Sequence, residues 1–155
     1  MQTGPHVYVD ADACPVKTEV AKVAERHALA VTYVANSWVQ PPRGPRFRTH
    51  VVSGAFDAAD DWIVEQVVPA DVVITADIPL ASRCLKKGAR VLGPAGKPFT
   101  GDNIGNALAT RDLMTDLRAY GVGGGPAPFA PRDRSRFLEA LELVVREAKR
   151  ELAGG

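Results

Sequence analysis

Residues 7–15 have the sequence Val7-Tyr8-Val9-Asp10-Ala11-Asp12-Ala13-Cys14-Pro15, and this stretch decides the fold. Three apolar residues end in two aspartates one residue apart, and a proline and a helical pattern follow. The order predicts a first strand that delivers Asp10 and Asp12 to the carboxyl edge of a sheet. Carboxylates this close raise each other's pKa unless a metal ion or hydrogen-bond donors compensate. A simpler interpretation is that Asp12 only caps the helix that Pro15 opens.

Length and composition predict one globular domain. The chain has 155 residues, of which 46% are hydrophobic and 24% charged, so a real core can form and the composition argues against global disorder. The net charge of +1 means that any polyanion site must come from a local patch. Cys14 and Cys84 lack metal-type spacing, and we expect both to be reduced. The sequence has no signal-like or bilayer-spanning apolar run, which predicts a cytoplasmic protein.

The first half of the chain alternates between helical and strand patterns. Apolar residues recur at helical spacing over residues 15–28, which predicts a helix. Residues 30–35 are nearly all apolar or β-branched, as in strands buried on both faces of a parallel sheet, and Asn36 follows them. A short third strand is expected over residues 49–53.

Residues 40–48 contain three prolines and a glycine, so they predict a loop. Arg43, Arg46 and Arg48 surround Phe47 in this loop. The combination suits contact with a nucleic-acid backbone through the arginines and with a stacked base through the phenylalanine. The alternative is a solvated basic loop without a ligand.

A helix is expected within residues 54–68, and three acids stand in its first turn. Asp57 and Asp61 are explained by the favourable interaction of acids with a helix N-terminus. Asp60 lies one turn before the apolar stripe of Ile63 and Val67, so it points along the buried side. A carboxylate in that position requires a partner.

The second half repeats the pattern of apolar strand, acid and proline-opened helix. A strand over residues 71–76 delivers Asp77, and a helix over 79–87 and a strand over 89–93 follow. Further helices are expected over 103–120 and 135–152, with a glycine-rich connection at 121–126 that lacks the pattern of a phosphate loop. The last helix packs on the domain or on a second subunit, which would make a homodimer. The alternation predicts a single α/β domain with a mostly parallel five-stranded sheet.

The predicted strand ends bring the acids to one edge. Ligands of open α/β sheets bind outside the carboxyl ends of the strands, where Asp10, Asp12, Asn36 and Asp77 are expected and Asp60 enters from a helix start. Four carboxylates on one rim favour a hard divalent cation, Mg²⁺ or Mn²⁺. The chemistry that follows is hydrolysis of a phosphodiester, with arginines contacting the substrate.

Several motifs together resemble the bacterial YaiI/YqxD family, also labelled UPF0178 or DUF188, over nearly the whole chain. The motifs are residues 10–15, 34–36, 56–60 and 74–81, joined by Arg111, Arg118, Gly124-Gly125-Pro126 and Asp133-Arg134. The resemblance groups the chain with PIN-like and NYN nuclease domains. It implies a three-layer α/β/α fold and an acidic metal pocket at Asp10, Asp60 and Asp77, with Asp12 as a fourth acid. RNA is favoured over DNA as the substrate. Because the family is itself uncharacterised, the resemblance establishes no activity, and Asp61 and Asp102 lie outside its motifs.

Two other functions remain open from the sequence. A haloacid-dehalogenase-like phosphatase also opens with a strand and Asp-x-Asp, and it would use Asp10 as a nucleophile that becomes phosphorylated. Cys14 and the Gly101-Asp102 pair depart from that pattern. The second alternative is a PIN-like module that binds RNA or a protein without cleaving it. For Cys14 itself, a small packing residue is favoured over a reactive thiolate.

Overall fold

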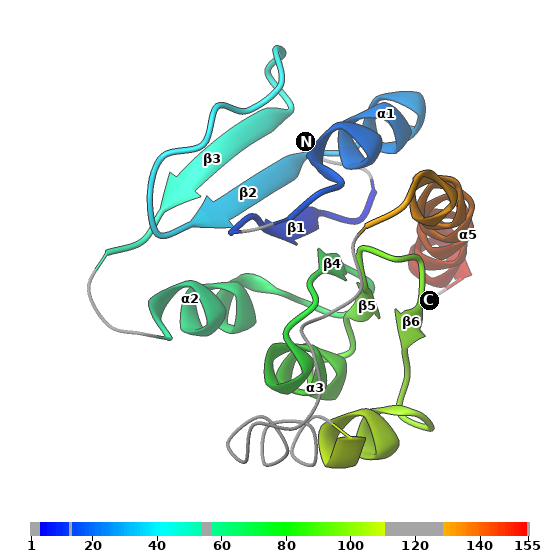
Figure 1. Cartoon of the computed structure of the whole chain (residues 1–155). Coiled ribbons are helices and arrows are strands. Elements are labelled where there is room, and N and C mark those ends of the chain that lie inside the picture. The colour runs from blue at the N-terminus through cyan, green and yellow to red at the C-terminus, as the bar shows by residue number, and fades with distance from the viewer. Residues whose placement is uncertain (1–3, 13, 54–56, 111–128, 155) are drawn as a thin grey trace.

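The computed structural model describes residues 4–12, 14–53, 57–110 and 129–154, and it has an α/β architecture (Figure 1). The elements are β1 (Val7–Asp10), α1 (Lys17–His27), β2 (Val31–Ala35), β3 (Phe47–Val51), α2 (Ala58–Gln66), β4 (Val72–Ile74), α3 (Ile78–Lys86), β5 (Arg90–Leu92), β6 (Pro98–Phe99) and α5 (Pro131–Gly154). Residues 104–110 are also helical, within the expected helix over 103–120. The rest of that helix and the glycine-rich connection lie outside the described residues.

The strands form one sheet in the order β3-β2-β1-β4-β5-β6, and β3 and β6 are its edges. Every neighbouring pair is parallel except β5 and β6, which are antiparallel. The sheet therefore has six strands, and the predicted number of five was wrong. The additional strand is only two residues long and contains Pro98, a residue that argues against a strand except at a sheet edge.

The third strand begins earlier than predicted, at Phe47 instead of Thr49. Phe47 pairs with Val31 and is only 6% exposed, so it belongs to the core. The interpretation of Phe47 as a stacking platform for a base was therefore wrong. Burial of its ring against the sheet outweighs the loop signals of the prolines that precede it.

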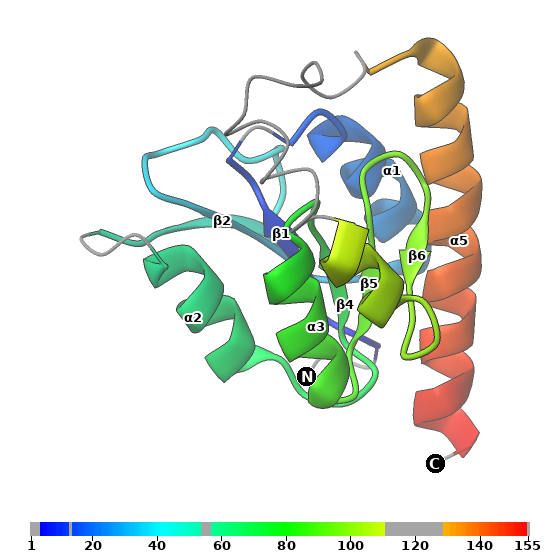
Figure 2. The ribbon, with the colours of Figure 1, turned by 60° about the horizontal axis from the view of Figure 1, so that its bottom comes forward.

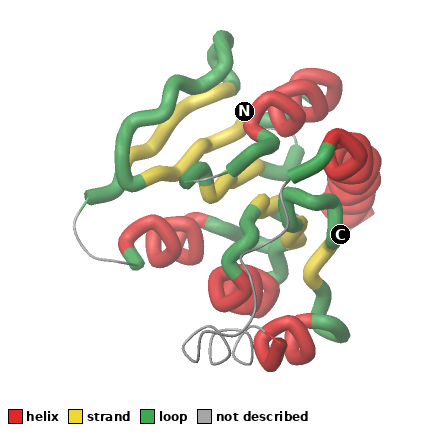
Figure 3. Tube along the Cα trace, viewed as in Figure 1, coloured by secondary structure: helices red, strands yellow, loops and turns green. Residues whose placement is uncertain are grey.

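Helices cover both faces of the sheet, as Figures 2 and 3 show. Alternate residues of β1, β2, β4 and β5 contribute to two separate cores, which explains why these four strands are mostly apolar. On one face, α1 and α5 pack against Val7, Val9 and the side chains in register with them. On the other face, α2 and α3 pack against Tyr8 and its neighbours.

The long helix α5 packs on the domain, as one of the two sequence-based alternatives proposed. Its buried residues are Phe137, Leu141, Val144, Val145 and Ala148. It is held to α1 by an ion pair between Arg26 and Glu142 at 2.7 Å and by a hydrogen bond between His27 Nε2 and Glu142 at 2.8 Å. Among the described helices, none combines the length and apolarity needed to cross a membrane.

A tight turn after β5 also contacts α5. Gly96 has a φ of 89°, and a Cβ built there would meet the backbone of Arg136 at 2.8 to 2.9 Å. Glycine is required both for the left-handed backbone and for this close approach.

Candidate functional site

The topology places a crevice between β1 and β4. These strands are neighbours at the centre of the sheet, and the chain leaves β1 for α1 on one face and β4 for α3 on the other. Such a switch point in an open α/β sheet leaves room for a ligand at the carboxyl ends of the two strands. Asp10 ends β1 there, and Thr75 to Asp77 follow β4.

Thr75 links the two strand ends. Its hydroxyl donates a hydrogen bond to Asp10 Oδ2 at 2.8 Å and accepts one from the Asp77 backbone N–H at 2.9 Å. Thr75 is only 2% exposed, so both partners are needed to satisfy the buried hydroxyl. This arrangement fixes the orientation of the Asp10 carboxylate relative to the start of α3.

Asp77 is the N-cap of α3, and Pro79 stands in the first turn. Its Oδ1 accepts a hydrogen bond from Leu80 N at 2.9 Å. One carboxylate oxygen is thus used to start the helix, and the charge stays at the rim beside Asp10.

Asp12 connects β1 to the next strand end instead of capping a helix. Its Oδ2 accepts a hydrogen bond from the Asn36 backbone N–H at 3.2 Å, and both residues are exposed. The N-cap of α1 is Val16, which makes no side-chain cap bond, so the interpretation of Asp12 as a helix cap was wrong. The reason is that the helix begins at Lys17, two residues later than expected.

Asp60 lies half-buried in the first turn of α2, as its position relative to Ile63 predicted. Burial raises its pKa to about 6, and the negative charges of Asp77, Asp10 and Asp57 add to the effect while Arg83 opposes it. The carboxylates of Asp60, Asp77 and Asp10 are therefore within electrostatic reach of one another, although they come from three separate segments.

The surroundings of Asp10 also raise the pKa of its carboxyl group. Burial raises its pKa; the hydrogen bond from Thr75 works against this, and the charges of Asp77 and Asp12 raise it further. Burial and the two neighbouring carboxylates therefore disfavour the ionised form of Asp10 in the folded protein.

A small cavity of about 110 Å³ opens beside Asp10 and Asp12. Cys14, Thr75 and Pro94 are among its other lining residues. Burial raises the pKa of the Cys14 thiol, which keeps it protonated and supports its interpretation as a packing residue over that of a thiolate. Both cysteines are free. The cavity has room for a few water molecules.

The carboxylates at this edge fit a magnesium site better than a zinc site. Within residues 4–12, 14–53, 57–110 and 129–154, no three His, Cys, Asp or Glu side chains converge into a ready-made ligand cluster. A cage of protein ligands, as zinc requires, is thus not present in that part of the chain. Mg²⁺ usually keeps several waters and uses one or two carboxylates together with substrate phosphate. Asp10 and Asp12, which face the same cavity, match that requirement.

Of the predicted substrate arginines, Arg46 and Arg48 lie in the described part of the chain, and neither is placed at this rim. Arg46 directly precedes β3, and its carbonyl accepts from Val31 N at 2.8 Å, so it lies at the amino edge of the sheet, opposite the acids. Arg48 lies near His6, whose pKa is lowered to about 4 by burial and then by the charge of Arg48. Arg111 and Arg118 lie outside the described residues.

Sequence reasoning missed two residues beside the acids. Thr75 carried a usable signal, because a polar residue in a buried strand needs a partner and stands two positions before Asp77. Arg83 carried none. Its guanidinium reaches Asp61 Oδ1 at 2.9 Å and lowers the pKa of Asp60 only because α2 and α3 pack side by side.

Comparisons with known proteins give a family and no activity. Residues 8–147 match the family model described as an uncharacterised YaiI/YqxD family, DUF188. A UPF0178 protein of Rhodopseudomonas palustris strain TIE-1 is 57% identical over 148 residues, which cover 95% of this chain and 94% of the relative. UPF0178 proteins of Rhodospirillum rubrum and Agrobacterium fabrum are 60% and 56% identical, over 93% and 97% of this chain and 97% and 99% of their own lengths. No solved structure matches the chain.

Proposed function

We propose that this chain, which belongs to the YaiI/YqxD family (DUF188), is a Mg²⁺- or Mn²⁺-dependent nuclease that hydrolyses phosphodiester bonds, with RNA as its substrate. The proposal includes a PIN-like arrangement of three layers, helix, sheet and helix. The observation that supports it lies at the switch point between β1 and β4, where Asp10 and Asp12 line one cavity and Thr75 ties Asp10 to the start of α3.

Electrostatics support a cation at this rim. The ionised forms of Asp10 and Asp60 are disfavoured by burial and by neighbouring carboxylates, and Arg83 opposes this only for Asp60. A divalent cation would relieve the repulsion and return the pKa of both groups toward ordinary values. Asp10 and Asp12 would hold it, through one or both carboxylates and through water in the adjoining cavity. When bound, such an ion acts as a Lewis acid toward a phosphoryl oxygen.

The chain's own residues then have separate roles. Thr75 fixes the Asp10 carboxylate through its hydrogen bond. Asp60 enters the rim from the first turn of α2 and adds a carboxylate that can orient an attacking water. Asp77 supplies charge at the rim while its other oxygen caps α3.

The test is Mn²⁺ titration by calorimetry together with cleavage of fluorescent single-stranded RNA and DNA oligonucleotides. We expect Asp10→Asn and Asp77→Asn each to lower cleavage at least about 100-fold and to weaken Mn²⁺ binding, because both lose a charge at the rim. Asn also caps helices well, so Asp77→Asn removes the charge without removing the cap of α3. The matched control is Asp102→Asn, an exposed acid outside the rim.

The outcomes separate the alternatives. Absence of both Mn²⁺ and Mg²⁺ affinity in the wild type would overturn the proposal. RNA binding without cleavage, unchanged in Asp77→Asn, would identify a non-catalytic module. A phosphorylated Asp10 after incubation with a phosphomonoester would identify a phosphatase.

A further inference from the structure

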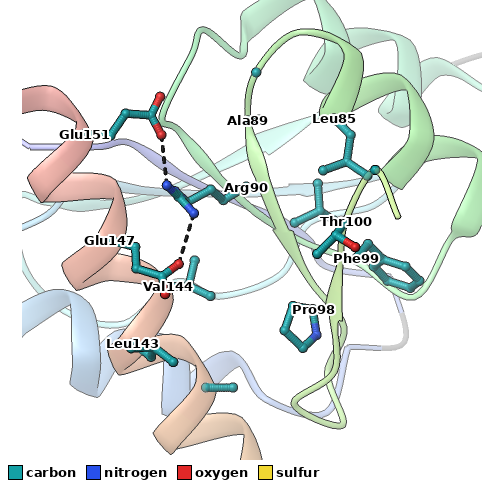
Figure 4. Close-up of a pocket in the computed structure, with 14 residues that line it drawn as sticks. Leu85, Ala89, Arg90, Pro98, Phe99, Thr100, Leu143, Val144, Glu147 and Glu151 are labelled. Atoms are coloured by element: carbon teal, nitrogen blue, oxygen red, sulfur yellow. Dashed lines mark hydrogen bonds and ion pairs between the residues drawn. The ribbon is translucent and has the colours of Figure 1, made fainter. Parts of the chain in front are cut away.

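A second and larger cavity lies at the far side of the sheet from the acidic rim. It has a volume of about 480 Å³ and lies between α5, the end of α3 and the β5–β6 pair (Figure 4). Arg90, which begins β5, stands at its wall, whereas Asp10 and Asp77 stand at the opposite ends of the parallel strands. This cavity is therefore independent of the proposed nuclease site. Its size falls within the range of small-molecule sites, about 300 to 1,000 Å³.

Most of the wall is apolar. Val91 and Val144 are buried, at 2% and 7% exposure, and Leu85 and Phe99 border the same space. Leu143 lies on the α5 side and is 54% exposed, although it is a large aliphatic residue. An apolar body of a ligand would cover Leu143 and the exposed parts of Leu85 and Phe99 and remove them from water.

The polar side of the cavity carries an excess of negative charge. Arg90 lies between Glu147 and Glu151, with its two terminal nitrogens 3.0 Å from Glu147 Oε2 and from Glu151 Oε1 (Figure 4). Two carboxylates against one guanidinium leave a charge of −1. Among the described residues, the second oxygen of each carboxylate has no hydrogen-bond partner, and the side chains are 40% and 42% exposed.

Arg90 is poorly placed to attract an anion instead. Both terminal nitrogens already face carboxylates, and Nε is buried with no acceptor, so it is out of reach of a ligand in the cavity. Among the described residues that line the cavity, Arg90 is the only cationic one.

We infer that this cavity binds a small organic cation, with an ammonium group at Glu147 and Glu151 and an apolar body against Val91, Phe99 and Leu143. Charge complementarity selects the ammonium group, and the apolar walls select a body of aromatic or branched aliphatic type. The carboxylate oxygens left without partners accept its N–H donors as charge-assisted hydrogen bonds.

Three probes of the same shape test the inference: 2-phenylethylammonium, 2-phenylethanol and 3-phenylpropionate, each titrated into the full chain and followed by two-dimensional NMR. We expect saturable binding of the ammonium compound, at least about tenfold tighter than the alcohol, and no saturation by the carboxylate. Shifts should concentrate on residues around Val91 and Val144.

Two variants make the test specific. Glu151→Gln removes the excess charge while Glu147 still pairs with Arg90, and it should reduce the preference for the ammonium compound over the alcohol by about tenfold. Leu143→Asn removes an apolar side chain that is largely exposed in the free protein. It should weaken the binding of the ammonium compound and of the alcohol to the same extent. Glu139 is an exposed acid of α5 outside the cavity, so Glu139→Gln should leave the affinities for the ammonium compound and for the alcohol unchanged. Equal or tighter binding of the carboxylate, no saturation by the ammonium compound, or an unchanged preference in Glu151→Gln would each overturn the inference.

Discussion

The Thr75 hydroxyl lies 2.8 Å from Asp10 Oδ2, so a side chain that follows β4 holds a carboxylate that ends β1. The same hydroxyl accepts from the Asp77 N–H. One buried oxygen therefore ties together the two strands that border the crevice and the first turn of α3.

Replacing Thr75 with valine should destabilise the fold and loosen the site. The change keeps the shape but leaves the Asp77 N–H and Asp10 Oδ2 without this partner, which costs about 1–3 kcal/mol. Loss of the hydrogen bond also raises the pKa of Asp10 further, since that bond now opposes the effect of burial. Urea unfolding and Mn²⁺ calorimetry measure both effects, and Thr75→Ser, which keeps the hydroxyl, should resemble the wild type.

Asp60 should make the protein less stable as pH rises through about 4 to 6. Its folded pKa of about 6 lies above the ordinary 3.8, so the folded state binds the proton more tightly than the unfolded state does. Stability from protonated Asp60 is complete below the ordinary value and is lost as pH rises through the folded value. Asp60→Asn lacks this contribution, so the wild type should lose stability relative to Asp60→Asn as pH rises through this interval.

Urea midpoints at pH 4, 5, 6 and 7 measure this difference, without added metal. The control is Glu65→Gln, an exposed acid on the same helix, which should follow the wild-type curve. Parallel curves for wild type and Asp60→Asn would contradict the assignment of a raised pKa to Asp60.

Glu142 should have the opposite pH dependence. Burial alone would raise its pKa, but hydrogen bonds from His27, Arg26 and Arg146 outweigh it and lower the pKa to about 2. The folded value lies below the ordinary 4.5, so the stabilisation is present above that pH and disappears as pH falls toward 2. Glu142→Gln should be less stable than the wild type at pH 7 and equal to it near pH 2.

Thermal unfolding followed by circular dichroism checks this convergence. Glu139→Gln, on the exposed side of α5, is the control and should leave the midpoint unchanged at both pH values. A constant difference between wild type and Glu142→Gln across the range would show that His27, Arg26 and Arg146 do not act through the charge of Glu142.

Gly96→Ala should destabilise the protein by about 1–3 kcal/mol or more, because the new methyl group meets the Arg136 backbone and the φ of 89° disfavours alanine. Gly101→Ala is a matched control, since a Cβ there meets nothing within 4 Å. Guanidinium unfolding of the two variants should separate them clearly. Similar midpoints would contradict the close approach of the turn to α5.

The positions of Asp10 and Asp77 could be predicted from the sequence, because an apolar run marks a buried strand and its end marks the end of that strand. Val7 to Val9 and Val72 to Ile74 are buried strands, and the acids after them meet because β1 and β4 are parallel neighbours. Asp60 was predicted from helical spacing alone. These inferences depend on local periodicity, which the sequence expresses directly.

The position of the arginines was not accessible in this way. The segment 36–46 joins two parallel strands, β2 and β3, so it must return to the opposite edge of the sheet before β3 begins. Arg46 is carried to that edge, away from Asp10. Strand direction, which fixes the edge, is a property of the whole sheet and leaves no mark on residues 40–48 themselves.

The two outer strands of the sheet have unequal lengths, so they differ in their capacity to pair with a strand of another molecule. β6 offers two residues, one of them a proline, and is too short to template a further strand. β3 offers five, and in the described chain it is paired only with β2. Protection against intermolecular strand addition, and so against aggregation, therefore falls mainly on β3, where the exposed charge of Arg48 opposes a second copy.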